Sequence, residues 1–218
     1  MLKVERIPNK EARPWILRKH YAHRMPCVQF AFGLFDGREC VGVVTYGPPP
    51  TPAIKQAIFG GKWQERIYEL NRLCVGTEAR NAASRLVGGS LRVLPCPGCV
   101  VSYADGAQGH VGYIYQATNF LFTGTAQAHD CEFLIHGKSV HGRTLTARGI
   151  TDHIAWAKRN NIQMRYPEPK NRYVYFIGNK NDRREMRAAL RYPVLPYPKG
   201  ETKRYDASAE IVTQLSLF

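Results

Sequence analysis

The stretch that decides the fold is "GTEARNAASRLVGGSL" (76–91), which lies between two apolar runs, "IYELNRLCV" (67–75) and "CVVSYAD" (99–105). Short apolar runs bounded by turn residues are typical of buried strands, whereas apolar residues at helical spacing over 84–94 predict a helix. Its inward-facing residues would be Leu86, Val87, Leu91 and Leu94. A strand that turns directly into a helix leaves free backbone amides at the positive end of the helix, which can take a pyrophosphate.

The rest of the chain adds antiparallel pieces on both sides of this unit. Residues 28–47 predict a hairpin about Asp36-Gly37, and a helix is expected at 15–24. Further along we expect a surface loop at 48–63, helices at 109–120, 151–160 and 182–190, and hairpins at 131–146 and 162–178. This order predicts an α/β fold with a mixed, mostly antiparallel central sheet flanked by helices. We expect one domain over 1–200 and a tail at 201–218.

The charge of the chain indicates a polyanionic partner. It carries 31 Lys and Arg against 17 Asp and Glu, a formal charge of +14. Such an excess of positive charge is most often found in proteins that bind nucleic acid. Residues 158–204 hold 13 basic and 4 acidic residues with tyrosines between them. Mixed arginines and aromatics can neutralise phosphates and stack on bases. The candidate DNA-binding residues are Arg172, Arg183, Arg184, Arg187 and Tyr197.

The cysteines and the lack of a targeting signal indicate the compartment. Most of the six cysteines lie inside apolar runs, where a thiol behaves as a small buried hydrophobe and stays reduced. No run of 18 apolar residues and no N-terminal signal is present. We therefore expect a soluble, cytoplasmic protein with no membrane partner.

Five short motifs together carry a family resemblance. They are "RKHYAHRMP" (18–26), "YELNRL" (68–73), "ASRLVGG" (83–89), "YADGAQGHVGYIYQATNFLFTG" (103–124) and the pair "KNRYVYF" and "RYPVLPYPK" within 170–199. In combination, over 15–199, they resemble the Mom family of phage DNA-modification proteins. The resemblance implies a Gcn5-related N-acetyltransferase-like fold. It also implies transfer of an acetamido-type (carbamoylmethyl) group to the exocyclic N6 amine of adenine in DNA, which protects the DNA from restriction.

The resemblance also implies a set of catalytic residues: Asp105, Tyr115, His20, Tyr21 and Ser84. Asp105 would accept a proton from adenine N6, and its alternative is a cap for the helix that follows. Tyr115 would be a general acid or a core residue, with Tyr113 as its rival. His20 and Tyr21 would contact the substrate, although a histidine in a basic helix is more often at the surface. Ser84 would bind an anion or cap its helix.

The candidate cofactor-binding residues surround the turn at 76–85: Arg72, Arg80, Asn81, Ser84 and Arg85. Arg72 would clamp a phosphate or carboxylate, while its neighbour Asn71 could simply bond the sheet edge. Acetyltransferases carry small, flexible residues where this chain has Ala83 and Arg85. A Cβ and a guanidinium there hinder close backbone approach, so we expect coenzyme A to bind weakly or not at all.

A metal ion is an open alternative. Cys96 and Cys99 form a single C-x-x-C, whereas a structural zinc site requires a second pair of ligands. His110 or His129 could complete such a site, and a mononuclear iron or zinc remains a further hypothesis.

Two other functions compete with DNA modification. One is a conventional N-acetyltransferase acting on a protein, tRNA or a small amine, and the other is a basic nucleic-acid-binding module without activity. A separate partner is indicated at the end of the chain, where Gln214, Leu215, Ser216, Leu217 and Phe218 look like the peptide that binds the bacterial sliding clamp. Alternatively, these apolar residues pack back on the domain.

Overall fold

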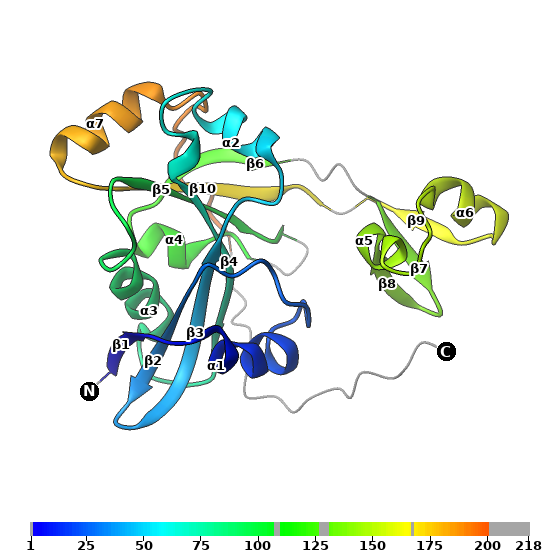
Figure 1. Cartoon of the computed structure of the whole chain (residues 1–218), viewed down its shortest axis with the longest axis horizontal. Helices are drawn as coiled ribbons and strands as arrows, with labels where there is room; N and C mark the ends of the chain where they lie inside the picture. The colour runs from blue at the N-terminus through cyan, green and yellow to red at the C-terminus, as the bar shows by residue number, and fades with distance from the viewer. Residues whose placement is uncertain (1, 107–109, 127–130, 167, 201–218) are drawn as a thin grey trace.

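A seven-stranded sheet forms the body of the protein (Figure 1). The computed structural model describes residues 2–106, 110–126, 131–166 and 168–200. In spatial order the strands are β1 (Leu2–Arg6), β2 (Phe30–Asp36), β3 (Glu39–Gly47), β4 (Ile67–Val75), β5 (Gly98–Ala104), β10 (Lys170–Ile177) and β6 (Leu121–Ala126). β4 and β5 run parallel, and the other described neighbours are antiparallel. The predicted mixed, mostly antiparallel sheet is confirmed.

Helices cover both faces of the sheet. On one face lie α3 (Ala82–Leu91) and α4 (Tyr113–Ala117). On the other face, α1 (Asn9–Pro14) and a π-helical turn (Trp15–Lys19) pack on β2 to β4, while α2 (Pro52–Ile58) and α7 (Lys180–Ala189) pack on β5 and β10. A short 3-10 helix (Gln64–Arg66) precedes β4. The four apolar residues predicted to face inward from α3 or just after it are all buried.

A smaller unit is inserted between β6 and β10 and projects from the edge of the main sheet (Figure 1). We call residues 131–166 the inserted lobe. It contains a three-stranded sheet in the order β8-β7-β9 and two helices. Its elements are β7 (Glu132–Ile135), β8 (Lys138–His141), α5 (Gly142–Thr146), α6 (His153–Arg159) and β9 (Gln163–Arg165). The lobe has its own hydrophobic cluster around Phe133 and Leu145.

Several predicted elements differ from those observed. The segment 48–63 is not only a loop, because α2 begins with Pro52 at its first turn and buries Ile58 and Phe59. The early helix ends at Lys19, before His20. The helix expected at 109–120 covers only Tyr113–Ala117, since Gly112 takes a left-handed conformation at its N-cap. His110 therefore does not share a helix with Tyr115.

The hairpin predicted at 162–178 is wrong. β9 pairs with β7 inside the inserted lobe, whereas β10 lies between β5 and β6 in the main sheet. Alternation of side chains predicts two strands here but carries no information about which partner each strand takes. The hairpin at 28–47 and the strand pair β7–β8 within 131–146 are confirmed.

The central strands β4 and β5 separate toward their C-terminal ends. β4 and β5 pair only over Ile67–Glu69 and Cys99–Val101. The pairing of β3 with β4 contains a bulge. Thr45 faces Arg72 and the next residue, Tyr46, faces Leu70, so Asn71 of β4 has no residue opposite it in β3. Bulges of this kind redirect side chains and are frequent beside active sites. The separation opens space for a site between the two strands.

Candidate functional site

A cavity of about 680 Å³ lies between the separated ends of β4 and β5 and the N-terminal ends of α3 and α4. Its lining includes eight of the residues predicted for catalysis or cofactor binding: His20, Tyr21, Arg72, Arg80, Asn81, Ser84, Asp105 and Tyr115. Arg85, predicted to contact a cofactor, is exposed and does not line the cavity. Residues from five separate segments thus converge on one concave site, as ligand sites generally require.

Asp105 follows β5 directly and lines the cavity. Its Oδ2 atom lies 2.9 Å from Nζ of Lys170, the first residue of β10. Asp105 does not cap α4, because α4 begins at Tyr113 and its N-cap is Gly112. The carboxylate is 13% exposed and charge-paired, so it is available to a group bound in the cavity.

Tyr115 and its rival Tyr113 lie in different environments. The Ser102 hydroxyl donates to the carbonyl of Leu70 at 2.9 Å, and the Tyr115 hydroxyl lies 2.8 Å from Ser102 Oγ. Since the serine has one proton, Tyr115 must be the donor of this second bond. Burial raises the pKa of Tyr115 to about 12. Tyr113 is 41% exposed and bonds the carbonyl of Gly200.

The π-helical turn brings His20 into the cavity. The His20 amide donates to the carbonyl of Trp15, five residues earlier, and the chain then becomes extended. His20 is 5% exposed, and burial, with the nearby Arg72 charge as the next cause, lowers its pKa to about 3. Its Nδ1 accepts the amide of Ala22 at 3.0 Å, so the ring is neutral with its proton on Nε2.

Aromatic rings form one wall of the cavity. The rings of His20 and Tyr21 stack with centroids 4.4 Å apart, and Tyr21 meets His110 edge-on at 6.4 Å. Burial also lowers the pKa of His110, whereas Asp105 raises it by a smaller amount. The alternative that His20 is a surface residue is wrong, because its side chain is buried and the predicted helix ends one residue earlier.

Arg72 and Asn71 hold the segment that carries His20 and Tyr21 against the sheet. Arg72 donates from Nε and Nη2 to the carbonyl of Arg24 at 3.3 and 3.2 Å, and from Nη1 to its neighbour's carbonyl at 2.6 Å. Asn71 donates to the carbonyl of Cys27 at 3.0 Å and accepts from Thr45 at 2.7 Å. Gly47 permits this approach, because a Cβ there would lie 1.9 Å from the Cys27 oxygen.

The turn before α3 differs from a coenzyme A cradle. Asn81 is the N-cap with a positive φ of 60°, and the Ser84 hydroxyl donates to its carbonyl at 3.0 Å, so Ser84 does not cap the helix. The amide of Ala82, the first residue of α3, already donates to the carbonyl of Ala79 at 3.2 Å. Of the two residues predicted to hinder the cofactor, only Ala83 lines the cavity. The engaged amide of Ala82 and the Cβ of Ala83 leave less room for close approach of a pyrophosphate.

No group of three or more histidine, cysteine and acidic side chains arranged to hold a metal ion occurs within the described parts of the chain. Cys96 is exposed and Cys99 is buried in β5, so the C-x-x-C does not form a common face. His129 lies outside the described residues. In the parts of the chain that the structure covers, no helix is long and apolar enough to span a bilayer.

Sequence reasoning missed Lys170 and Ser102 and named His110 only as a possible metal ligand. Lys170 pairs with Asp105, Ser102 holds the Tyr115 hydroxyl, and His110 borders Tyr21. A serine inside the apolar run 99–105 was the available signal for Ser102, because a buried hydroxyl needs partners. Lys170 had no such signal, since its partner is 65 positions away in the sequence.

The predicted DNA-binding residues are divided by the structure. Arg172 is 8% exposed and is not a surface contact, because its guanidinium donates to Oγ1 and the carbonyl of Thr123 at 3.0 and 2.8 Å and stacks on the ring of Tyr192. Tyr197 is 43% exposed, with its hydroxyl bonded to the carbonyl of Phe120. The clamp-like residues Gln214, Leu215, Leu217 and Phe218 lie outside the described residues.

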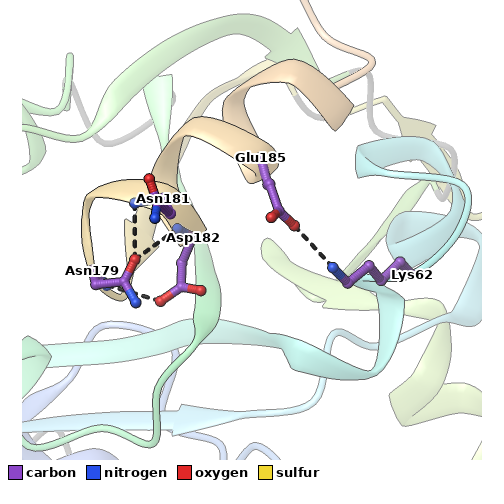
Figure 2. Close-up of polar contacts among 5 residues, drawn as sticks. All are labelled: Lys62, Asn179, Asn181, Asp182 and Glu185. Atoms are coloured by element: carbon purple, nitrogen blue, oxygen red, sulfur yellow. Dashed lines mark hydrogen bonds and ion pairs between the residues drawn. The ribbon is translucent and has the colours of Figure 1, made fainter.

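The other three candidates, Arg183, Arg184 and Arg187, are exposed on α7. Figure 2 shows how this helix is fixed: the Asn179 side chain accepts the amides of Asn181 and Asp182, and Asp182 accepts the amide of Asn179 in return. Lys62 pairs with Glu185 at 2.8 Å (Figure 2). α7 therefore presents its arginines from a well-defined position.

Comparison with known proteins identifies relatives along most of the chain. The sequence matches the Mom protein family over residues 1–199. The methylcarbamoylase mom of Escherichia phage Mu is 31% identical over 207 residues, which cover 91% of this chain and 84% of the relative.

Solved structures with the same architecture are acetyltransferases. Arabidopsis thaliana NAA60 in complex with a bisubstrate analogue superimposes with a TM-score of 0.51 and 14% identity, covering 82% of this chain and 99% of that one. An N-acetyltransferase from Staphylococcus aureus Mu50 gives a TM-score of 0.47 and 14% identity over the same shares. The predicted acetyltransferase-like fold is confirmed.

Proposed function

Since the chain belongs to the Mom protein family, we propose that it is a DNA-modifying transferase. It adds a carbamoylmethyl group to the exocyclic N6 amine of adenine in DNA, and acts in the cytoplasm of a bacterial host on phage or prophage DNA. The methylcarbamoylase of phage Mu supports the type of reaction. The modification would shield the DNA from restriction.

The observation that carries this proposal is the convergence of Asp105 and a wall of aromatic rings on one cavity. An adenine inside a duplex is out of reach, so an enzyme that modifies it must extrude the base into a pocket and stack it on flat side chains. His20 and Tyr21 offer such surfaces. A volume of about 680 Å³ is in the range of sites that enclose small ligands.

The chemistry assigns a role to the carboxylate. The lone pair of adenine N6 is delocalised into the ring, so the amine is a poor nucleophile until it loses a proton. As the bond from N6 to the incoming methylene carbon forms and the donor's leaving group departs, one N6 proton passes to Asp105. The ammonium of Lys170, 2.9 Å from Oδ2, orients the Asp105 carboxylate before that transfer.

We also propose that acetyl-coenzyme A is not the group donor of this reaction, as the sequence predicts. Acetyl-coenzyme A should bind weakly or not at all, because the Cβ of Ala83 and the engaged amide of Ala82 restrict the turn before α3. Isothermal titration calorimetry with the purified protein measures this directly. A dissociation constant in the micromolar range would show that the cradle functions despite its sequence.

Nucleoside mass spectrometry tests the proposed function. DNA from bacteria that express the protein should contain a new adenine derivative heavier by one carbamoylmethyl substituent, and DNA from cells with an empty vector should not. Unmodified DNA together with an acetylated protein or tRNA would instead identify a conventional N-acetyltransferase.

We also propose that α7 contributes to DNA binding through Arg183, Arg184 and Arg187. Charge reversal at these positions should flatten the dependence of log affinity on log salt by about 0.9 per lost phosphate contact. Fluorescence polarisation with a labelled duplex at several salt concentrations provides the slope. If the slope does not change, the duplex lies elsewhere on the protein.

The C-terminal peptide supports a further proposal, that the tail binds the bacterial sliding clamp. Such peptides place apolar side chains in a groove while a glutamine supplies directed hydrogen bonds, and tethering would raise the local concentration of DNA. We expect labelled "TQLSLF" to bind the clamp in a polarisation titration, and a peptide with Gln214→Ala and Leu217→Ala not to bind. Equal signals from both peptides would refute this proposal.

A further inference from the structure

We infer that the inserted lobe is a docking surface for double-stranded DNA next to the cavity. This inference rests on the proposed function, since it names a surface through which the same site would receive its substrate. Three observations support the inference: the position of the lobe in the fold, the open face of its sheet and its charge.

The lobe joins the main sheet at the end where Asp105 lies. Lys170 of β10 pairs with Ala126 of β6, and the next residue of β10, Asn171, pairs with Ala104 of β5. Both connections of the lobe therefore leave the sheet beside the residue that precedes Asp105. The returning connection also contacts the site itself, because Lys170 binds Asp105 at 2.9 Å.

One face of the lobe's sheet is covered and the other is open. Phe133 and Val140 point to the covered face, where they pack with Leu145 of α5 and Ala157 of α6. The opposite face holds two cross-strand rows, His141, Glu132 and Arg165 in one and Ser139, Leu134 and Gln163 in the other. Leu134 at its centre is 41% exposed, so the described elements leave this face uncovered.

The open face has dimensions and chemistry suited to a DNA groove. Neighbouring strands are about 4.8 Å apart, so two adjacent strands of this face have the width of the two-stranded ribbon that the major groove, about 12 Å wide, admits. Strands are known to enter grooves with their polar side chains toward base edges. Ser139, Gln163 and Arg165 supply hydrogen-bonding groups, and Tyr166, next to Arg165, is 69% exposed.

The charge of the lobe favours a polyanion over a protein partner. Residues 131–166 contain six Lys and Arg but only two carboxylates. Both carboxylates already have partners within the lobe, since Glu132 accepts from Ser139 and Asp152 accepts the amide of Ala155 at the start of α6. Arg165 is exposed on the open face and could neutralise a phosphate there, whereas Lys158 and Arg159 are exposed on α6, which covers the opposite face, and add only to the positive field of the lobe.

The lobe is also closer to the reaction than α7. α7 follows Ile177, which pairs with Gly98 at the far end of β5. Seven residues of strand span about 20 Å, so arginines on α7 bind phosphates at a distance from the base in the cavity. The lobe would hold the duplex that flanks the extruded adenine.

The test compares two single variants of the full chain that lose the same charge. Arg165→Gln removes the cation of the open face, whereas Arg92→Gln removes an exposed cation from the end of α3. Binding of a labelled duplex of about two helical turns is measured by polarisation across salt concentrations. Modified adenine is measured by mass spectrometry of the cellular DNA.

We expect Arg165→Gln, the lobe variant, to lower the salt slope by about 0.9 and to reduce modification severalfold, while Arg92→Gln, the control variant, changes neither. An unchanged slope in the lobe variant overturns the inference but leaves the proposed function intact if the wild type still modifies adenine. Equal losses of affinity for duplex DNA and single-stranded RNA would also overturn it, by showing general attraction to polyanions. If the wild type makes no modified adenine, the proposed function itself fails.

Discussion

Asp105→Asn should reduce adenine modification by about 10²–10⁴-fold while changing affinity for duplex DNA by less than about twofold. The substitution preserves the shape of the side chain but removes the group that accepts the N6 proton. It also leaves Lys170 without its anionic partner. The readouts are nucleoside mass spectrometry for modification and fluorescence polarisation for binding.

A neighbouring substitution provides the control. Glu168→Gln makes the same change from acid to amide close to Gly106, but Glu168 is exposed and does not line the cavity. It should modify DNA at the wild-type rate. If Asp105→Asn retains more than about a tenth of the activity, Asp105 is not the proton acceptor, and the carboxylate serves only to hold Lys170.

Arg172→Ala should destabilise the fold by about 2–4 kcal/mol, because it removes two charge-assisted hydrogen bonds and the stacking on Tyr192, and leaves the Thr123 carbonyl without this donor. For a chain of this size the expected fall in Tm is roughly 4–16 °C. Differential scanning calorimetry gives the Tm, and the salt slope of DNA binding should not change.

Arg187→Ala, at an exposed site on α7, is the matched control and should alter stability by less than about 0.5 kcal/mol. A structural role and a DNA-binding role of Arg172 then predict opposite changes in the Tm and in the salt slope of DNA binding. A normal Tm together with a slope lowered by about 0.9 would mean that Arg172 binds a phosphate, contrary to its buried position.

The strands and most helices could be predicted because their signals are local. Alternation and apolar runs located β2 to β5, and helical spacing located α3, α6 and α7. Local signals gave no information on partners, so β10 was assigned to β9 although it lies between β5 and β6. The inserted lobe was missed for the same reason, since a separate core shows only when contacts distant in sequence are known.

The candidate site was predicted more completely than its internal geometry. The sequence identified eight of the residues that line the cavity, yet it placed His20 within a helix and, from the charge of its segment, Arg172 on a DNA-binding surface. Both errors concern the environment of a residue rather than its identity. A π-helical turn and a cation stacked on Tyr192 depend on packing that no short motif encodes.

The position of β10 has a consequence for how the chain folds during synthesis. β10 separates β5 from β6, yet the ribosome makes it after both of them and after the entire inserted lobe. Until it emerges, β5 and β6 expose unpaired edges, which are prone to join the strands of other molecules. The lobe has its own core and can complete its local contacts in the meantime. The main sheet is then completed by the entry of a single strand into a waiting gap, and that same step brings Lys170 to Asp105. A nascent chain without β10 therefore lacks the ion pair that orients its carboxylate, and the activity develops only once the sheet is complete.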